Sequence, residues 1–228
     1  KRQLSARCFF LNPNKCEKEE LEILLNDPMF LVRVIAARAI IKLSDKKLFE
    51  SAIRKMAEET PLSRYSYRDA LINADNEKFQ WLEELASTEK NSEICSICLD
   101  LLSTRTTTNQ FPIAKKFIYT GSKECKFNSI QILKKLPGKE TVDLLTHSLS
   151  DNDWEIRAEG AKALASLQMV ETAPQLEPLL SDKVWMVRLQ AALALKQFDQ
   201  KGMKFLSEQN REQSPEAYEI TQYVISLP

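Results

Sequence analysis

The chain has 228 residues, with 32 basic and 32 acidic side chains, so its formal charge is zero. That balance argues against a dedicated nucleic-acid binder, because such proteins normally carry a strong basic excess or a basic stripe. The longest apolar stretch is interrupted by Arg33 and Arg38, so it does not have the composition of a membrane-spanning helix.

A sequence pattern recurs along the chain. It reads DPMFLVRVIAARAIIKL at 27–43, DNDWEIRAEGAKALASL at 151–167 and DKVWMVRLQAALALKQF at 182–198. The last two copies begin 31 residues apart, and the first two begin 124 residues apart, which is four such periods. A fixed period of this size is typical of repeat solenoids, in which each unit packs on its neighbours. The pattern therefore predicts one solenoid domain over 1–228 rather than a globule with a central core.

Each period predicts two helices. Counted from the arginine of each copy, apolar or small residues fall at offsets −1, +3, +4, +7 and +10, which is one stripe of a 3.6-residue helix. This is the second helix of each pair, and Asp27, Asp151 and Asp182 stand where its N-cap is expected. Strands are not expected, because period-2 alternation is absent. The first helices are expected at roughly 17–25, 48–58, 78–88, 112–119, 139–149, 173–180 and 201–208, and the last helix over 215–227.

The beginning of the chain keeps the same phase. One period before Arg33 and Ala37 stand Arg2 and Ala6. We therefore expect the chain to begin inside the second helix of another repeat, and to be a fragment of a longer protein. A cytoplasmic location is expected, with a lost N-terminal tether or signal left open.

The recurring pattern has an acid, then five residues, an arginine and closely spaced alanines. It resembles the short HEAT-like repeat of the phycobilisome-lyase type. The residues that carry the resemblance are Asp27/Arg33, Asp151/Arg157 and Asp182/Arg188, with Ala37/Ala39, Ala161/Ala163 and Ala192/Ala194. The middle copies depart from it at Glu58/Arg64, which keeps the charges, at Glu89/Cys95, which loses the arginine, and at Thr120/Lys126, which loses the acid. The resemblance implies an all-α solenoid, a right-handed superhelix of about seven antiparallel helix pairs. It also implies that second helices line the concave face and that the Asp and Arg columns form a polar ladder between repeats.

The five cysteines predict no disulfide framework. Cys8, Cys98 and Cys125 fall in columns that otherwise hold small buried residues, which is typical of reduced structural thiols in a cytosolic protein. Cys95 and Cys98 form a CxxC, which on a helix could supply half a metal site or a redox pair. A structural role is favoured, because a zinc site needs about four ligands and there is no second CxxC.

The single histidine, His147, has no partners that suggest a catalytic triad, and no phosphate-binding glycine loop or zinc-protease motif is present. No catalytic residue, metal or cofactor is therefore predicted. Phe30, Trp154 and Trp185 share one column, three residues before the arginine. They could line a groove or pack between repeats, and packing is favoured. Trp81 is expected in the core.

The remaining positions of the second helices, at offsets +2 and +5, carry mixed chemistry, as a partner-facing surface would. Solvent exposure explains the mixture equally well, but exposed apolar members at Ile35, Ile97 and Leu193 favour contact. The candidate partner-binding residues are Ile35, Arg38, Ser66, Asp69, Ile97, Asp100, Gln131, Glu159, Lys162, Gln190 and Leu193.

The sequence favours a non-enzymatic, monomeric scaffold that binds a protein or peptide on its concave face. One alternative is a regulatory or substrate-binding module of a larger enzyme or membrane-associated protein. Another is a nucleic-acid-acting HEAT-like protein such as the alkylpurine glycosylases, which the neutral charge disfavours. A phycobilin-lyase role would rest on the repeat alone, and a repeat does not imply a function.

Overall fold

The computed structural model describes residues 7, 9–12 and 17–228. Throughout that part of the chain every regular element is a helix and there is no strand, as the sequence predicts. The chain divides into two compact units, 1–105 and 106–228. The proposed register of Arg2 and Ala6, and the proposed burial of Cys8, lie outside the described residues.

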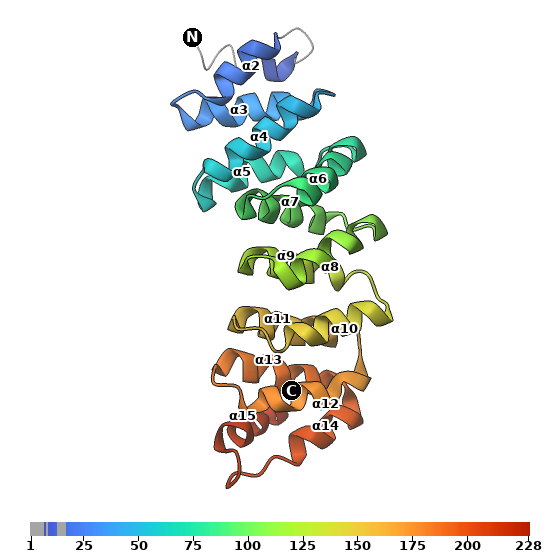
Figure 1. Ribbon diagram of the computed structural model, residues 1–228. Helices are drawn as coiled ribbons and strands as arrows, with labels where there is room; N and C mark the ends of the chain where they lie inside the picture. Colours follow the sequence, from blue (N-terminus) through green and yellow to red (C-terminus); the bar gives the residue numbers. More distant parts are fainter. Residues whose placement is uncertain (1–6, 8, 13–16) are drawn as a thin grey trace. The chain divides into compact units, whose positions relative to one another are not determined.

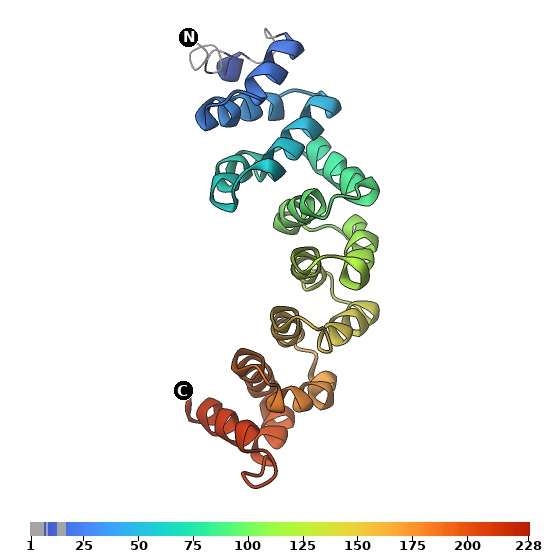
Figure 2. The ribbon, with the colours of Figure 1, turned by 60° about the vertical axis from the view of Figure 1, so that its left-hand side comes forward.

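Over residues 17–105, the first unit holds three helix pairs, each a first helix followed by a second helix. The first helices α2, α4 and α6 follow one another, and the second helices lie beside them (Figures 1 and 2). The helices are α2 (Lys18–Leu25), α3 (Phe30–Ile41), α4 (Lys46–Glu58), α5 (Pro61–Leu71), α6 (Asn76–Thr88) and α7 (Ser92–Thr104).

The second unit holds four helix pairs. Its second helices α9, α11, α13 and α15 each pack against the next (Figure 1). The first helix before α13 is broken into short segments, because Pro174 and Pro178 each remove a backbone donor from the helical ladder. The elements are η2 (Thr108–Gln110), α8 (Phe111–Thr120), α9 (Lys123–Leu133), α10 (Lys139–Ser148), α11 (Trp154–Ser166), η3 (Val170–Thr172), α12 (Ala173–Leu176), η4 (Glu177–Ser181), α13 (Trp185–Gln197), α14 (Asp199–Ser207) and α15 (Pro215–Ser226).

Small residues let the helices approach closely. Ala36, Ala161 and Ala192 are fully buried in the second-helix stripe, as their offsets predict. A Cβ on Gly160 would lie 2.1 Å from the Ser148 hydroxyl oxygen, and one on Gly202 would lie 1.8 Å from the Leu195 carbonyl oxygen. Both glycines are therefore required by close contact between neighbouring helices.

The expectation that Asp27, Asp151 and Asp182 are N-caps is wrong. The capping residues of α3, α11 and α13 are two positions later and make no side-chain cap. Each aspartate instead accepts a hydrogen bond from the backbone N–H two residues on, at 2.8 Å, 2.9 Å and 2.8 Å. That bond closes an Asx turn, so the carboxylate stabilises the bend between the two helices rather than the helix end.

Candidate functional site

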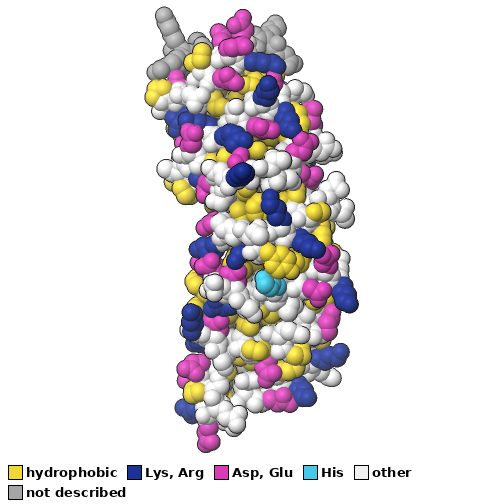
Figure 3. All heavy atoms as spheres, in the orientation of Figure 1, with side chains coloured by type: hydrophobic (Ala, Val, Ile, Leu, Met, Phe, Trp, Pro, Cys, Tyr) yellow, Lys and Arg dark blue, Asp and Glu magenta, His cyan; other side chains and the backbone are white. Residues whose placement is uncertain are grey.

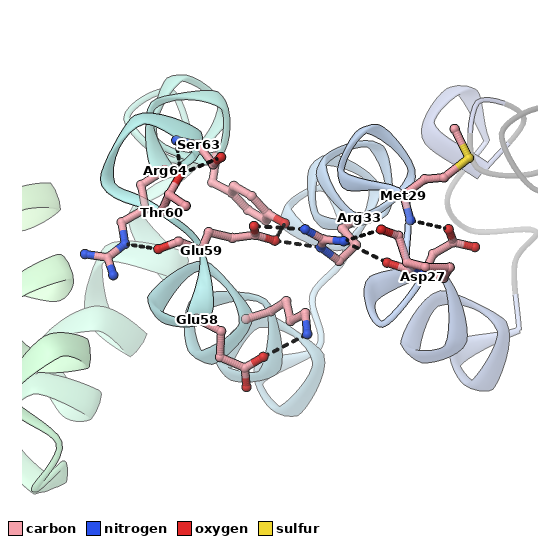
Figure 4. A network of polar contacts seen from close by, with 11 residues as sticks. Asp27, Met29, Arg33, Glu58, Glu59, Thr60, Ser63 and Arg64 are labelled. Atoms are coloured by element: carbon pink, nitrogen blue, oxygen red, sulfur yellow. Dashed lines mark hydrogen bonds and ion pairs between the residues drawn. The ribbon is translucent and has the colours of Figure 1, made fainter.

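Arg33 joins two neighbouring helix pairs (Figure 4). Its Nη1 donates to the Asp27 carbonyl oxygen at 2.9 Å, within its own pair. Its Nε and Nη2 donate to the two carboxylate oxygens of Glu59, in the next pair, at 2.6 Å and 2.9 Å. The Tyr67 hydroxyl donates to the same carboxylate at 3.1 Å. One arginine thus closes its own turn and binds the following pair.

The ionisable groups of this network change one another's pKa values. The hydrogen bond from Arg33 holds the pKa of Glu59 below its usual value, against the opposing effect of burial. Burial, followed by the negative charge of Glu59, raises the pKa of Tyr67 far above its usual value. Glu59 is therefore charged and Tyr67 neutral near neutral pH, as the hydrogen-bond geometry requires.

The second unit repeats the arrangement at Arg157. Its Nη1 donates to the Asp151 carbonyl oxygen at 2.8 Å, and its Nε and Nη2 bind the Asp182 carboxylate at 2.7 Å and 2.9 Å. Arg188 donates to the Asp182 carbonyl oxygen at 2.8 Å. The polar ladder that the resemblance implies is present at Arg33, Arg157 and Arg188, but within each pair the arginine binds the backbone carbonyl of the aspartate. Where a carboxylate is bound, it belongs to the next helix pair.

The middle copies keep parts of this ladder. Arg64 donates to the Glu59 carbonyl oxygen at 3.1 Å and pairs with Glu93 of the next helix pair. The Cys95 thiol lies 3.5 Å from the Glu89 carbonyl oxygen, so it takes over the bond within the pair but carries no charge. Lys126 replaces an arginine and lies 2.6 Å from an oxygen of the Asp151 carboxylate.

The ion pairs between helix pairs all run in one direction. In the described residues, each has its cation in the earlier helix pair and its carboxylate in the next one. This pattern makes the stacking directional, because turning one helix pair around would bring like charges face to face. The pairs are Lys18–Asp45, Arg33–Glu59, Arg38–Asp69, Lys46–Glu84, Arg54–Glu89, Arg64–Glu93, Arg68–Asp100, Lys115–Glu140, Lys123–Glu155, Lys126–Asp151, Lys134–Glu159 and Arg157–Asp182.

Most of the charged candidate binding residues take part in this stacking. Arg38 lies 3.3 Å from the Asp69 carboxylate, and Gln131 donates to Glu159 at 2.7 Å. Asp100 accepts from Arg68 at 2.6 Å. Contacts between neighbouring helices therefore explain the polar chemistry at these positions. A role in partner binding remains a prediction for the whole candidate set.

The apolar members of the candidate set are less exposed than expected. Ile97 is buried, with 5% of its surface accessible, so its expected exposure is wrong. Buried side chains occupy almost every side of α7, and a helix that is apolar all round does not offer a solvent face. Ile35 packs against the cluster of Leu24, Val32 and Ala36 and is part-buried, as is Leu193. Ser66 and Gln190 are part-buried, and Lys162 is exposed.

Exposed apolar side chains gather instead where the second helices begin. Of the thirteen large hydrophobic residues exposed in the described part of the chain, ten belong to second helices or their N-caps. Eight of the ten lie from the N-cap to the fifth residue of a helix, and we name these eight the apolar edge. They are Met29, Leu31, Leu62 and Tyr65 in the first unit, and Phe127, Trp154, Trp185 and Met186 in the second.

The aromatic column of Phe30, Trp154 and Trp185 does not follow one interpretation throughout, since one member packs between repeats and two are exposed. Phe30 packs against Tyr67, with ring centroids 6.3 Å apart, as the packing interpretation expects. Trp154 and Trp185 are 39% and 49% exposed, so they belong to the surface. Trp81 is part-buried and contacts Phe49 edge-on at 5.5 Å. The repeat period identified the column but did not show which members face solvent.

A shallow groove of about 480 Å³ lies at the C-terminal ends of α3 and α5. It contains Arg38 and Asp69, two of the candidate residues, together with Lys42, whose ammonium lies 3.7 Å from the centre of the Phe10 ring. Its lining includes two cations, Arg38 and Lys42, and two carboxylates, Asp69 and Asp75, so it has no single charge preference.

The thiols and the histidine have structural surroundings. Cys95, Cys98 and Cys125 are buried. Within the described ranges, no group of three or more His, Cys, Asp or Glu could hold a metal ion. His147 is exposed and its ring lies 4.7 Å from that of Tyr119; Figure 3 shows the histidine in cyan beside apolar side chains. The face in Figure 3 mixes basic and acidic side chains along its length.

Helix pairs linked by a polar ladder define an all-α helical-repeat protein. Residues 114–199 match the sequence model of a family described as HEAT repeats. HEAT repeats are thus shown for residues 114–199, in agreement with the resemblance seen in the sequence. None of the helices among the described residues is both long and apolar enough to cross a membrane.

Solved structures with a similar arrangement have low sequence identity to this chain. Human deoxyhypusine hydroxylase in complex with glycerol is 16% identical, with a TM-score of 0.45 over 91% of this chain and 83% of that one. YibA of E. coli is 15% identical, with a TM-score of 0.45 over 95% and 94%. An engineered protein is 16% identical, with a TM-score of 0.46 over 99% and 85%. No curated protein sequence matches the chain.

Proposed function

We propose that this HEAT-repeat chain is a non-enzymatic scaffold that binds a protein or peptide on the face of its second helices. The observation that carries the proposal is the apolar edge. Large apolar side chains exposed to water are unfavourable unless something covers them, and contiguous patches of them mark interaction surfaces in soluble proteins. Their concentration on second helices favours that face over the first helices.

The first unit offers the most exposed part of the edge. Leu62 and Tyr65 are 81% and 68% exposed, and they share one face of α5 because they are three residues apart. Met29 and Leu31 stand at the equivalent end of α3, which packs directly against α5. Aromatic and large aliphatic side chains in this setting are the usual anchors of protein interfaces.

The test is partner capture by surface variants. Leu62→Asp and Tyr65→Asp each place a charge in the apolar edge without touching the core, so each should change the free energy of unfolding by only about 0.5 kcal/mol. Loss of an anchor should weaken binding by about 2 kcal/mol or more. Affinity purification from the native cell extract, with quantitative mass spectrometry, measures the captured partner.

Ile23→Asp is the matched control. Ile23 is 71% exposed on the first helix α2, so the substitution adds the same charge to a comparably exposed site on the other layer. We expect this variant to retain the partner that Leu62→Asp loses. Equal retention by all three folded variants would refute binding at the apolar edge of the first unit. Ile97→Asp is unsuitable as a surface variant, because Ile97 is buried.

A further inference from the structure

A small pocket opens between the N-terminal halves of α13 and α15. Its volume is about 250 Å³, and its walls are Trp185 and Arg188 from α13 and Glu216, Glu219, Ile220 and Tyr223 from α15. Sites for whole small molecules usually have about 300–1,000 Å³, so this pocket suits a single side chain of a partner.

The walls of the pocket combine two kinds of group that bind cations. Trp185 and Tyr223 are 49% and 50% exposed, so both aromatic rings are accessible from solvent. Glu216 and Glu219 are exposed and three residues apart on α15, which places their carboxylates on one face of that helix. Aromatic faces and carboxylates both attract ammonium and guanidinium groups.

The ladder explains why these carboxylates lack a cation from within the chain. In the α9–α11 contact, Lys123 stands three residues before Lys126, which occupies the arginine column of the ladder. The Lys123 ammonium lies 3.1 Å from the Glu155 carboxylate. Two periods later, the position of Lys123 is occupied by Trp185. Two periods after Glu155 stands Ala217 of α15, and the acids of that helix, Glu216 and Glu219, lie one position before it and two after it. In the described residues no ion pair involves Glu216 or Glu219.

The arginine in the pocket is directed elsewhere. Arg188 donates through Nη1 to the Asp182 carbonyl oxygen, and its Nε is buried without a hydrogen-bond partner. The acid that would bind Nε in the ladder is replaced by Gln213, one period after Asp182. Arg188 and the two glutamates together give the pocket a formal charge of −1, which one monovalent cation neutralises.

From these features we infer that the α13–α15 pocket binds a lysine or arginine side chain of a peptide partner. The cation lies among the Trp185 and Tyr223 rings and the Glu216 and Glu219 carboxylates, at the position that Lys123 occupies two periods earlier. Residues 139–228 hold 9 basic and 14 acidic side chains, so the surrounding charge also attracts a basic peptide. The inference rests on the proposed function, and it names the chemistry of the partner at one point of the apolar edge.

The test uses small probes rather than an unknown partner. The indole N–H resonance of Trp185, assigned with Trp185→Phe, is followed by NMR during titration with N-acetyl-lysine methylamide. N-acetyl-norleucine methylamide, which has the same chain without the charge, is the matched probe. Trp154 stands in the same column but does not line the pocket, so its indole N–H is an internal control.

We expect a saturable shift of the Trp185 resonance with the lysine probe and none with norleucine, while Trp154 stays unchanged. The double variant Glu216→Gln/Glu219→Gln should bind the lysine probe about tenfold more weakly, which is the effect of losing one charge-assisted contact. Both positions are exposed, so the double variant should keep its melting temperature. Raising the salt to about 0.5 M should also weaken binding.

Equal shifts with the two probes, or unchanged affinity in the double variant, would overturn the inference. These outcomes are separable from failure of the proposed function. If the lysine probe does not bind but Leu62→Asp still loses the captured partner, the scaffold function stands and the cation pocket is wrong. If the probe binds and no edge variant loses a partner, the pocket stands and the wider binding face is wrong.

Discussion

Arg157 and Asp182 belong to successive helix pairs, and the arginine binds the aspartate through Nε and Nη2 at 2.7 Å and 2.9 Å. Only 9% and 11% of the two side chains are exposed. The remaining guanidinium nitrogen, Nη1, donates to the Asp151 and Asn152 carbonyl oxygens at 2.8 Å and 3.0 Å. One side chain therefore fixes a turn in its own pair and the position of the next.

Removing Arg157 should be costly, because it leaves the Asp182 carboxylate buried without its cation. We expect Arg157→Met to lower the free energy of unfolding by about 3 kcal/mol. Arg38→Met is the comparison, since Arg38 and Asp69 are 37% and 70% exposed, and it should cost less than about 0.5 kcal/mol. Urea denaturation followed by circular dichroism measures both. Similar costs for the two variants would show that the ladder contributes no more than surface pairing.

The Arg33–Glu59 pair should make the first unit sensitive to acid. Because the pKa of Glu59 is lowered in the folded state, its ionised form stabilises the fold at pH values above its ordinary pKa of about 4.3. That contribution is lost as the pH falls through the lowered pKa. Glu59→Gln should cost about 2 kcal/mol at pH 7 and much less at about pH 3.

Urea midpoints across that pH range test the linkage. Tyr67→Phe is the control, because it removes one hydrogen bond to Glu59 but leaves the Arg33 contact, which is the largest cause of the lowered pKa of Glu59. It should therefore retain most of the wild-type pH dependence. If Glu59→Gln lowers the free energy of unfolding equally at pH 7 and at about pH 3, this pH dependence does not come from the ionisation of Glu59.

Two glycines should resist replacement by alanine, although alanine favours a helix. Gly202→Ala drives a Cβ into the Leu195 backbone carbonyl, which cannot rotate away, so we expect a loss of about 3 kcal/mol. Gly160→Ala meets the Ser148 hydroxyl, which can be removed. Adding Ser148→Ala to Gly160→Ala should therefore restore most of the lost stability, whereas adding it to Gly202→Ala should restore none. Melting temperatures measure both effects. If Ser148→Ala restores no stability to Gly160→Ala, the strain does not lie at the Ser148 hydroxyl.

The period of the sequence was sufficient to predict the helices. The expected first helices agree with the observed ones within two residues at each end, apart from the proline-broken segment before α13. That success has a physical basis, because a solenoid buries its core between neighbours and each pair must repeat the same stripe. The alanine and glycine columns at Ala161 and Gly160 follow from the same requirement.

The exposed surface of the second helices was harder to predict. Offsets within one helix show which side chains leave the core stripe, but not which of them contact the next helix pair. The mixed chemistry at Arg38 and Asp69 predicts a binding surface, but stacking explains it. The offset of Ile97 predicts exposure, but α7 is buried on almost every side. The exposure of Leu62 and Trp185 depends on how far neighbouring pairs overlap at the helix starts, which no single-helix pattern contains.

The most direct measurement of the central claim is site-specific photo-crosslinking. A photoreactive phenylalanine analogue placed at Leu62, on the apolar edge, is compared with the same group at Ile23, on a first helix of similar exposure. If second helices carry the binding face, irradiation in the native cells yields a discrete protein adduct from position 62 and none from position 23. An adduct from position 23 alone, or the same adducts from both, would contradict a binding face formed by the second helices.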